Sequence, residues 1–133
     1  VIATHLGLPP HERQEQIDRL AEVLALRQAG VTIMLGDFNI FGPERRSLQR
    51  IGAPEQMPKL RSFPARRPLM SLDRIWTIPN RHLHKVEVHR TDTSSVASDH
   101  LPVVASIDPE VAHEHQAVFA RPHLWSMLRR RSR

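Results

Sequence analysis

Runs of apolar residues along the chain predict a series of β-strands. Residues 1–4 and 31–35 are short, nearly continuous apolar segments, and residues 31–35 are also rich in β-branched side chains. Such a run is typical of a strand that is buried on both faces of a sheet. Residues 72–78 and 101–107 are also predicted to be strands, and residues 83–89 alternate between apolar and polar positions. We expect these strands, apart from residues 83–89, to form one sheet.

A helical period separates the first two strands. Apolar residues recur three and four positions apart between residues 11 and 29, and Gly30 follows at a position where glycine commonly ends a helix. Strand, helix and buried strand together are typical of an α/β crossover unit. The helix is expected to pack on the sheet through Ile17, Leu20 and Leu24. Its other faces are expected to carry Arg13, Gln14, Asp18 and Glu22.

The second half of the chain contains longer loops. A short helix is predicted at residues 43–52, and residues 53–71 are rich in proline and arginine without a clear period. Long loops of this kind inside a compact domain are often functional. Residues 91–98 are predicted to be a polar loop. We assign residues 1–108 to one domain and residues 109–133 to a basic tail that is weakly helical or disordered.

The composition restricts the kind of metal site that the chain can form. The 133 residues contain no cysteine, so a disulfide framework and a thiolate-bound metal are both excluded. No apolar run approaches the ~20 residues that span a bilayer. The absence of cysteine is consistent with a reducing compartment, and we expect a cytoplasmic protein. Because Val1 lies inside a predicted strand, we also expect further residues upstream of it.

Positive charge is concentrated in the long loop and in the tail. The formal net charge is +5. Basic clusters attract polyanions such as nucleic acid or anionic lipid. For the tail, we favour the simpler interpretation of a solvated segment. In and after the long loop, the basic residues are Lys59, Arg61, Arg66, Arg67 and Arg74.

Acidic, amide and imidazole side chains cluster near the ends of the predicted strands. In open α/β sheets, ligands bind in the crevice beyond the strand ends, where loops bring distant residues together. Hydrolysis of a phosphate ester needs a divalent cation, a group that activates water and a group that stabilises the transition state. We expect one cleft with residues suited to these roles, lined by His5, Asp37, Asn39, Asp73, Asp99 and His100.

Each of these residues alone has a simpler structural role available to it. Aspartate and asparagine are common in turns, so Asp37 alone is weak evidence of catalysis. Asp73 could simply pair with Arg74, and His5 could be a histidine at a sheet edge with its hydrogen bonds satisfied. A chemical interpretation therefore depends on the combination of residues.

The combination resembles the endonuclease/exonuclease/phosphatase superfamily of DNase I-like, metal-dependent phosphoesterases. Four motifs occur in the order of that family, from residue 1 to about residue 107, and four in order are a strong signal. The resemblance implies a DNase I-like α/β sandwich of mixed sheets flanked by helices, of which this chain supplies the C-terminal half. The motifs are Thr4-His5-Leu6, Gly36-Asp37-Phe38-Asn39, Leu72-Asp73-Arg74-Ile75 and Ser98-Asp99-His100-Leu101-Pro102-Val103.

The first two motifs imply groups that handle water and phosphate. Asp37 would orient or deprotonate the attacking water and would also approach the metal, which is expected to be Mg²⁺ or Mn²⁺. Asn39 would hold that water and the phosphate. His5 would donate a hydrogen bond to a phosphate oxygen. The implied reaction is the metal-dependent hydrolysis of a phosphodiester or phosphomonoester.

The last two motifs imply a metal ligand and a charged pair. Asp99 would ligate the metal, and His100 would contact the scissile phosphate. Asp73 would lie behind His100, fix its tautomer and favour its charged form. In the loop ahead of the third motif, Arg66 and Arg67 either bind a substrate phosphate or lie in solvent. Because this loop is basic, we favour nucleic acid over a phospholipid headgroup as the substrate.

The four motifs cover only the C-terminal half of the family's domain. The family draws a metal-binding glutamate and an asparagine from its N-terminal half, and it packs two similar sheets face to face. We therefore expect that half upstream of Val1, an apolar sheet face with unusual exposure, and little or no catalysis by the 133 residues alone. The alternative hypothesis is a truncated, non-catalytic remnant that binds polyanions, either nucleic acid or anionic lipid, through the basic loop and tail.

Overall fold

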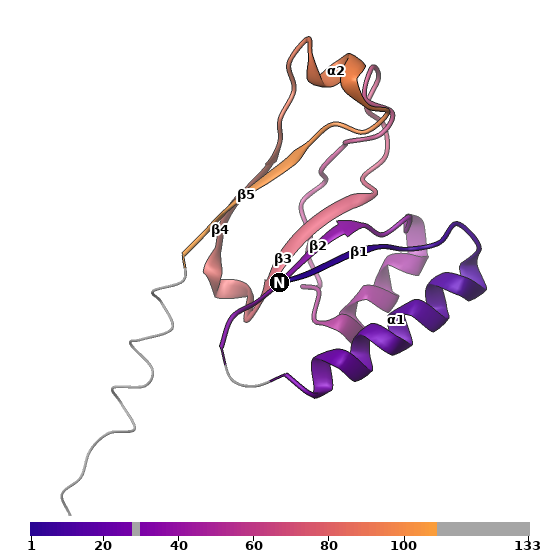
Figure 1. Cartoon of the computed structure of the whole chain (residues 1–133), viewed down its shortest axis with the longest axis vertical. Helices are drawn as coiled ribbons and strands as arrows, with labels where there is room; N and C mark the ends of the chain where they lie inside the picture. The colour runs from indigo at the N-terminus through magenta and orange to yellow at the C-terminus, as the bar shows by residue number, and fades with distance from the viewer. Residues whose placement is uncertain (28–29, 109–133) are drawn as a thin grey trace, which may run out of the picture.

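The computed structural model describes residues 1–27 and 30–108, and it shows a mixed α/β fold in which small sheets are flanked by helices (Figure 1). The basic tail and the helical segments predicted in it lie outside the described residues. No helix in the described ranges has the length and apolar character to cross a membrane. The elements, in chain order, are β1 (Ile2–His5), α1 (Pro10–Ala25), β2 (Thr32–Asp37), the 3₁₀ helix η1 (Gly42–Ile51), β3 (Asp73–Ile78), the 3₁₀ helix η2 (Asn80–His82), β4 (Leu83–Val88), α2 (Ser94–Ala97) and β5 (Val103–Ile107).

In a three-stranded sheet of order β1-β2-β3, the C-terminal ends of β1 and β2 lie beside the N-terminal end of β3. β1 runs parallel to β2, with α1 as the predicted crossover between them, and β3 runs antiparallel to β2. In this register His5 lies opposite Asp37, and Asp37 lies opposite Asp73. Strand pairing alone therefore brings these predicted site residues side by side.

The prediction that residues 101–107 belong to the same sheet is wrong. β5 pairs antiparallel with β4 in a separate two-stranded sheet. The two strands are joined by a short connection that contains α2, and antiparallel pairing of sequential strands is the most local solution. Figure 1 shows this pair extending away beside β3, and the residues of β5 do contact those of β3. The fourth motif therefore approaches β3 from the separate β4–β5 sheet.

An apolar cluster holds α1 against the three-stranded sheet. Ile17 is buried on α1, and Leu20 and Leu24 pack against the same cluster, as predicted. On the sheet side, the rings of Phe38 and Trp76 are fully buried, with centroids 4.9 Å apart. Truncating a buried aromatic side chain to alanine typically costs about 3–5 kcal/mol. This cluster is therefore the main support of β2 and β3, which carry the candidate site.

Arg13 does not lie on an exposed face of α1, as the helical pattern predicted. Its side chain is only 6% exposed and forms a two-pronged ion pair with Glu44, with Nη2–Oε2 at 2.7 Å and Nε–Oε1 at 3.0 Å. Nη1 also donates to the carbonyl oxygens of Gly7 and Leu8. A buried guanidinium is tolerated when its donors are satisfied in this way. Arg13 thereby ties the loop after β1 to η1.

The helix and loop predictions are otherwise close to the structure. α1 ends at Ala25 instead of residue 29, and residues 28–29 lie outside the described ranges. The predicted short helix is the 3₁₀ helix η1, and the predicted polar loop contains the single turn α2. Residues 53–71 form no helix or strand, and their pairing is limited to an isolated bridge between Phe63 and Met70.

Gly36 is required by the close approach of β1 and β2. Its φ is 144°, and a Cβ atom at this position would lie 1.8 Å from the backbone oxygen of Thr4. Any side chain there would push β1 away from β2. The glycine of the second motif therefore keeps the two strands together immediately before Asp37.

The sheet face opposite α1 is incompletely covered. Met34 and Trp76 face α1 and are fully buried. The alternate positions Ile33, Leu35 and Ile75 face the other way and are half-buried. Thr77, which pairs with Ile33 on this face, is fully buried, so the unusual exposure predicted for an apolar sheet face is not seen in the described residues.

Candidate active site

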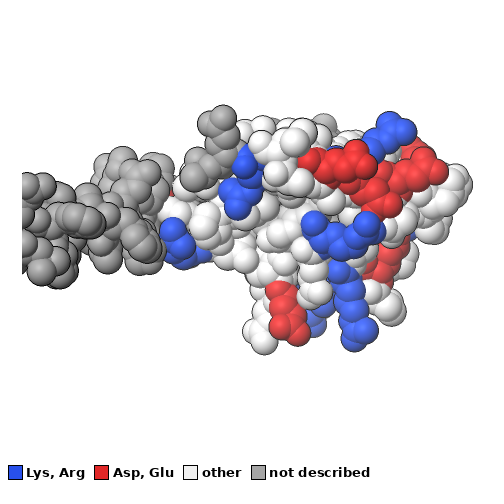
Figure 2. Space-filling model, turned by 90° about the horizontal axis from the view of Figure 1, so that it is seen from below, with Lys and Arg blue, Asp and Glu red and all other residues white. Residues whose placement is uncertain are grey.

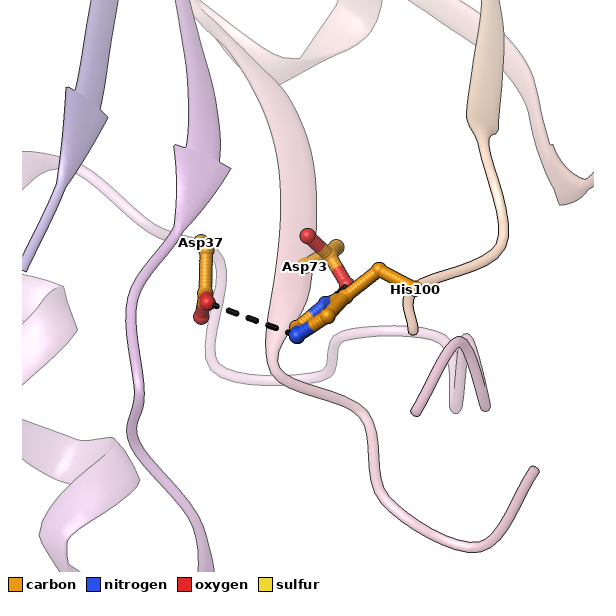
Figure 3. A group of neighbouring side chains, drawn as sticks. All are labelled: Asp37, Asp73 and His100. Atoms are coloured by element: carbon orange, nitrogen blue, oxygen red, sulfur yellow. Dashed lines mark hydrogen bonds and ion pairs between the residues drawn. The ribbon is translucent and has the colours of Figure 1, made fainter. Parts of the chain in front are cut away.

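The candidate site lies where β2 ends and β3 begins, beside the segment that leads into β5. Asp37 and Asp73 project from neighbouring strands, and the ring of His100 lies between their carboxylates (Figure 3). His5 adds a largely exposed imidazole from the end of β1. Residues from separate motifs thus meet at one end of the sheet.

His100 and Asp73 form a hydrogen-bonded pair, as the sequence predicted. The Nδ1–H group of His100 donates to Oδ2 of Asp73 over 2.7 Å. The buried hydroxyl of Ser62 donates to the same carboxylate oxygen. The phenyl ring of Phe63 packs on the imidazole, with ring centroids 4.8 Å apart. These contacts fix the ring so that its other nitrogen, Nε2, is directed toward Asp37.

Asp37 is held by its own loop and faces two imidazoles. Its Oδ1 atom accepts the backbone N–H of Asn39 at 2.9 Å. Its Oδ2 atom lies 3.6 Å from Nε2 of His5 and 3.8 Å from Nε2 of His100. The side chain is 13% exposed, so one oxygen is anchored while the other faces the cavity. This geometry suits a carboxylate that accepts a proton from water.

The carboxylates around His100 favour its charged form. Burial lowers the pKa of His100, but the hydrogen bond to Asp73 and the charges of Asp73, Asp37 and Asp99 outweigh burial and raise the pKa above its ordinary value of 6.5. The folded protein then binds this proton more tightly than the unfolded chain does. His100 therefore stabilises the fold fully below the unfolded pKa, and this contribution is lost as the pH rises through the raised pKa.

Replacing Asp73 with asparagine is expected to lower the pKa of His100. The amide keeps the shape of the carboxylate but removes the charge that opposes the effect of burial. A pH titration of the imidazole signals by NMR measures this pKa directly. Asp18→Asn on α1 is the matched control, since Asp18 is not among the charges that act on His100. The same His100 pKa in wild type and Asp73→Asn would show that the pair is not electrostatically coupled.

The predicted site residues line one cavity of about 650 Å³. The polar part of its wall includes every residue that the sequence placed in the cleft. The other part is apolar and includes Leu8, Phe41 and Met70. Polar groups converging on one side of a partly apolar cavity are typical of a ligand site. The shared lining comprises His5, Asp37, Asn39, Asp73, Asp99 and His100.

The carboxylates differ in how they could hold a divalent cation. Ligand atoms of Asp37, Asp73 and His100 all lie within 4.8 Å of one another. Asp73 is engaged by two hydrogen-bond donors, Ser62 and His100, which leaves Asp37 as the freer ligand of this group. Asp99, the predicted ligand, lines the same cavity but is outside this close group. Magnesium is usually bound through one or two carboxylates and keeps several of its waters, so a single free carboxylate oxygen can serve as a starting point for such a site.

Asn39 has a structural contact that the sequence did not predict. Its φ of 51° is in the left-handed region, which asparagine tolerates better than most residues. Its Nδ2 group donates to the carbonyl oxygen of Leu6 over 2.8 Å, in a buried position. Asn39 therefore joins the loop after β2 to the loop after β1, while it also lines the cavity.

The arginines of the long loop separate in the structure. Arg66 lies in a neighbouring hollow that also includes Asp99, and Arg67 does not line the main cavity. Arg74, within the third motif, is 3% exposed and donates to the carbonyl oxygens of Ile40 and Ser71. Burial, followed by the charge of Arg45, lowers the pKa of Arg74 to about 10 against the opposing charge of Asp73. Its contacts link the loop after β2 to the start of β3.

Ser62 and Phe63 were missed as site residues. Both lie in the loop that has no regular period, and only the fold shows that the loop contacts Asp73 and His100. The sole signal in the sequence was the length of the loop. Two backbone hydrogen bonds, from Ala65 to Asp99 and from Leu101 to Ser62, fasten this loop to the fourth motif.

Comparison with known proteins gives a likeness of fold. No family model matches the chain, and no curated protein matches it. A solved structure, described as a functionally unknown conserved protein from Enterococcus faecalis V583, is similar with a TM-score of 0.61 and 21% sequence identity over 81% of this chain. The chain covers 49% of that protein and so spans about half of its length. At this identity, the likeness concerns the fold alone.

Proposed function

We propose that this chain is part of a DNase I-like, metal-dependent phosphoesterase that hydrolyses a phosphodiester or phosphomonoester. The observation that carries the proposal is the hydrogen-bonded Asp73–His100 pair, with Nε2 of His100 facing Asp37 inside a cavity. A charged imidazole beside an acidic, water-accessible carboxylate suits the attack of water on a phosphate ester. The motifs that resemble the endonuclease/exonuclease/phosphatase superfamily supply the same residues.

Each residue then has a task in hydrolysis. Asp37 accepts a proton from water through Oδ2, the oxygen that faces the cavity. His100 donates a hydrogen bond from Nε2 to a phosphate oxygen, and Asp73 keeps the ring charged and oriented. His5 offers a second donor at the open side of the cavity. Asp99 and Asp37 would hold Mg²⁺ or Mn²⁺, which offsets charge on the phosphoryl oxygens when it is bound.

The proposal includes a second half of the domain. The chain aligns with about half of the Enterococcus protein, and Ile33, Leu35 and Ile75 form a half-buried face on which another layer could pack. A further metal ligand from that layer would fix the cation, and the 133 residues alone are then expected to be poor catalysts. We also propose that the enzyme acts in the cytoplasm, in keeping with the absence of cysteine from these 133 residues.

His100→Ala tests the proposed function. In the full-length protein, this change is expected to lower the turnover of bis(4-nitrophenyl) phosphate by about 10²–10³-fold, because it removes a donor to the phosphate. His84→Ala is the matched control, since His84 is exposed on β4 outside the cavity. Release of nitrophenolate gives the rate. No turnover by the unmodified protein with diesters and monoesters would instead favour the non-catalytic, polyanion-binding alternative.

A further inference from the structure

Two hollows lie beside the candidate site, and residues of the long loop line both of them. The first has a volume of about 330 Å³ and shares Ser98 and Asp99 with the main cavity. The second has a volume of about 440 Å³ and shares Arg66 and Ser95 with the first. The main cavity, the first hollow and the second hollow therefore form a series of adjacent hollows, each sharing wall residues with the next. This series ends between the long loop and the connection that contains α2.

Arg66 and Arg90 lie together at the far end of this series. Both line the second hollow, and Nη2 of Arg90 donates to the backbone oxygen of Arg66 over 3.3 Å. Within the described residues, neither guanidinium forms an ion pair. Asp92 also lines the hollow and is likewise without an ion pair to either arginine there. Guanidinium groups that line one hollow without a partner carboxylate are suited to a phosphate, whose oxygens match their planar donors.

The face shown in Figure 2 carries no uniform basic patch. On the face shown in Figure 2, acidic and basic side chains lie next to one another. Several basic residues are also paired, such as Arg13 with Glu44 and Arg50 with Asp18. Arg66 and Arg90 differ because they line one hollow, and this hollow adjoins the one beside the candidate site.

We infer that Arg66 and Arg90 form a second phosphate subsite, which binds a nucleic acid strand whose scissile phosphate lies at His100. The inference rests on the proposed function for the position of the scissile group. A nucleic acid strand repeats a phosphate at every nucleotide, so one strand can occupy both places. A simple phospholipid headgroup carries one phosphodiester and has no second phosphate to offer.

Binding of a single-stranded oligonucleotide tests the subsite. The full-length protein is titrated into a fluorescein-labelled twelve-nucleotide strand with phosphorothioate linkages that resist cleavage, with Mg²⁺ present, and anisotropy gives Kd at several salt concentrations. The double variant Arg66→Ala/Arg90→Ala is expected to raise Kd about tenfold at 0.1 M salt. The slope of log K against log salt is expected to become shallower by about 0.7, the value for one lost phosphate contact on a single strand.

Arg19→Ala/Arg46→Ala is the charge-matched control. Both arginines are exposed and lie on α1 and η1, away from the hollows. The control is expected to leave Kd and the salt slope close to those of the unmodified protein. Equal losses in both double variants would show that only net charge matters, and this would overturn the inference. A failure of the unmodified protein to bind the strand would also overturn it.

Lipid binding and catalysis are each measured separately from strand binding. Binding to vesicles that contain phosphatidylserine or a polyphosphorylated inositol lipid is measured with the same variants. Loss of vesicle binding in Arg66→Ala/Arg90→Ala, with oligonucleotide binding unchanged, would assign the arginines to lipid and overturn the inference. Turnover of bis(4-nitrophenyl) phosphate by the unmodified protein tests the proposed function by itself, because strand binding is measured without catalysis.

Discussion

Asp37→Asn is expected to lower phosphodiester turnover by up to about 10⁴-fold while the fold stays intact. The amide oxygen can still accept the backbone N–H of Asn39, which Oδ1 of Asp37 accepts over 2.9 Å. The change removes the negative charge and proton-accepting ability of Oδ2, which lies 3.8 Å from Nε2 of His100. The variant therefore separates the chemical role of Asp37 from its role in the loop.

The measurement for Asp37→Asn is kcat with bis(4-nitrophenyl) phosphate at saturating Mg²⁺, together with thermal unfolding. Asp18→Asn, which changes a half-exposed carboxylate on α1 that pairs with Arg50, serves as the control. We expect the control to keep its turnover and both variants to unfold near the wild-type temperature. Wild-type turnover by Asp37→Asn would contradict the assignment of Asp37 as the group that activates water.

Removal of the divalent cation is expected to reduce hydrolysis to the background rate. The cavity concentrates negative charge from Asp37, Asp73 and Asp99, and an anionic phosphate ester would be repelled without a cation. Chelation should therefore stop turnover, and added Mg²⁺ or Mn²⁺ should restore it. The test is the rate with excess chelator, followed by a titration of each metal.

Asp99→Ala refines the metal experiment. If Asp99 is a ligand, the variant needs more Mg²⁺ for half-maximal turnover, because fewer carboxylate oxygens hold the ion. Asp92→Ala, which changes an exposed residue of the same polar connection, is compared as a control for the loss of one negative charge. In the chelation experiment itself, unchanged turnover by the unmodified protein in excess chelator would refute the metal mechanism.

The core of the fold could be predicted from the sequence because its signals are local. The continuous apolar character of β2 and the helical period of α1 each specify an element and its buried face. The pairing of β5 with β4 could not be predicted in the same way. Apolar strands indicate that pairing occurs, but the choice of partner depends on the energies of the whole fold. The burial of Arg13 likewise depends on Glu44, which is remote in the sequence.

The candidate site was predictable as a set of residues and only partly as a geometry. Motif order indicated that Asp73 and His100 meet, and the hydrogen bond between them is present. Nothing in the sequence indicated that Ser62 donates to the same carboxylate. The donation of Asn39 to Leu6 was also unexpected, since a motif identifies a side chain without showing which backbone group lies beside it.

The candidate site is divided between two sheets, so its residues can separate without unfolding of the apolar core. Asp37 and Asp73 stand on the three-stranded sheet, whereas His100 precedes β5, whose ladder partner is β4. Proteins open locally in cooperative units at free energies below that of global unfolding. A transient detachment of the β4–β5 unit would carry His100 away from both carboxylates while the apolar cluster stayed folded. On heating or in denaturant, we therefore expect the contact between His100 and the two carboxylates to be lost before the apolar cluster melts.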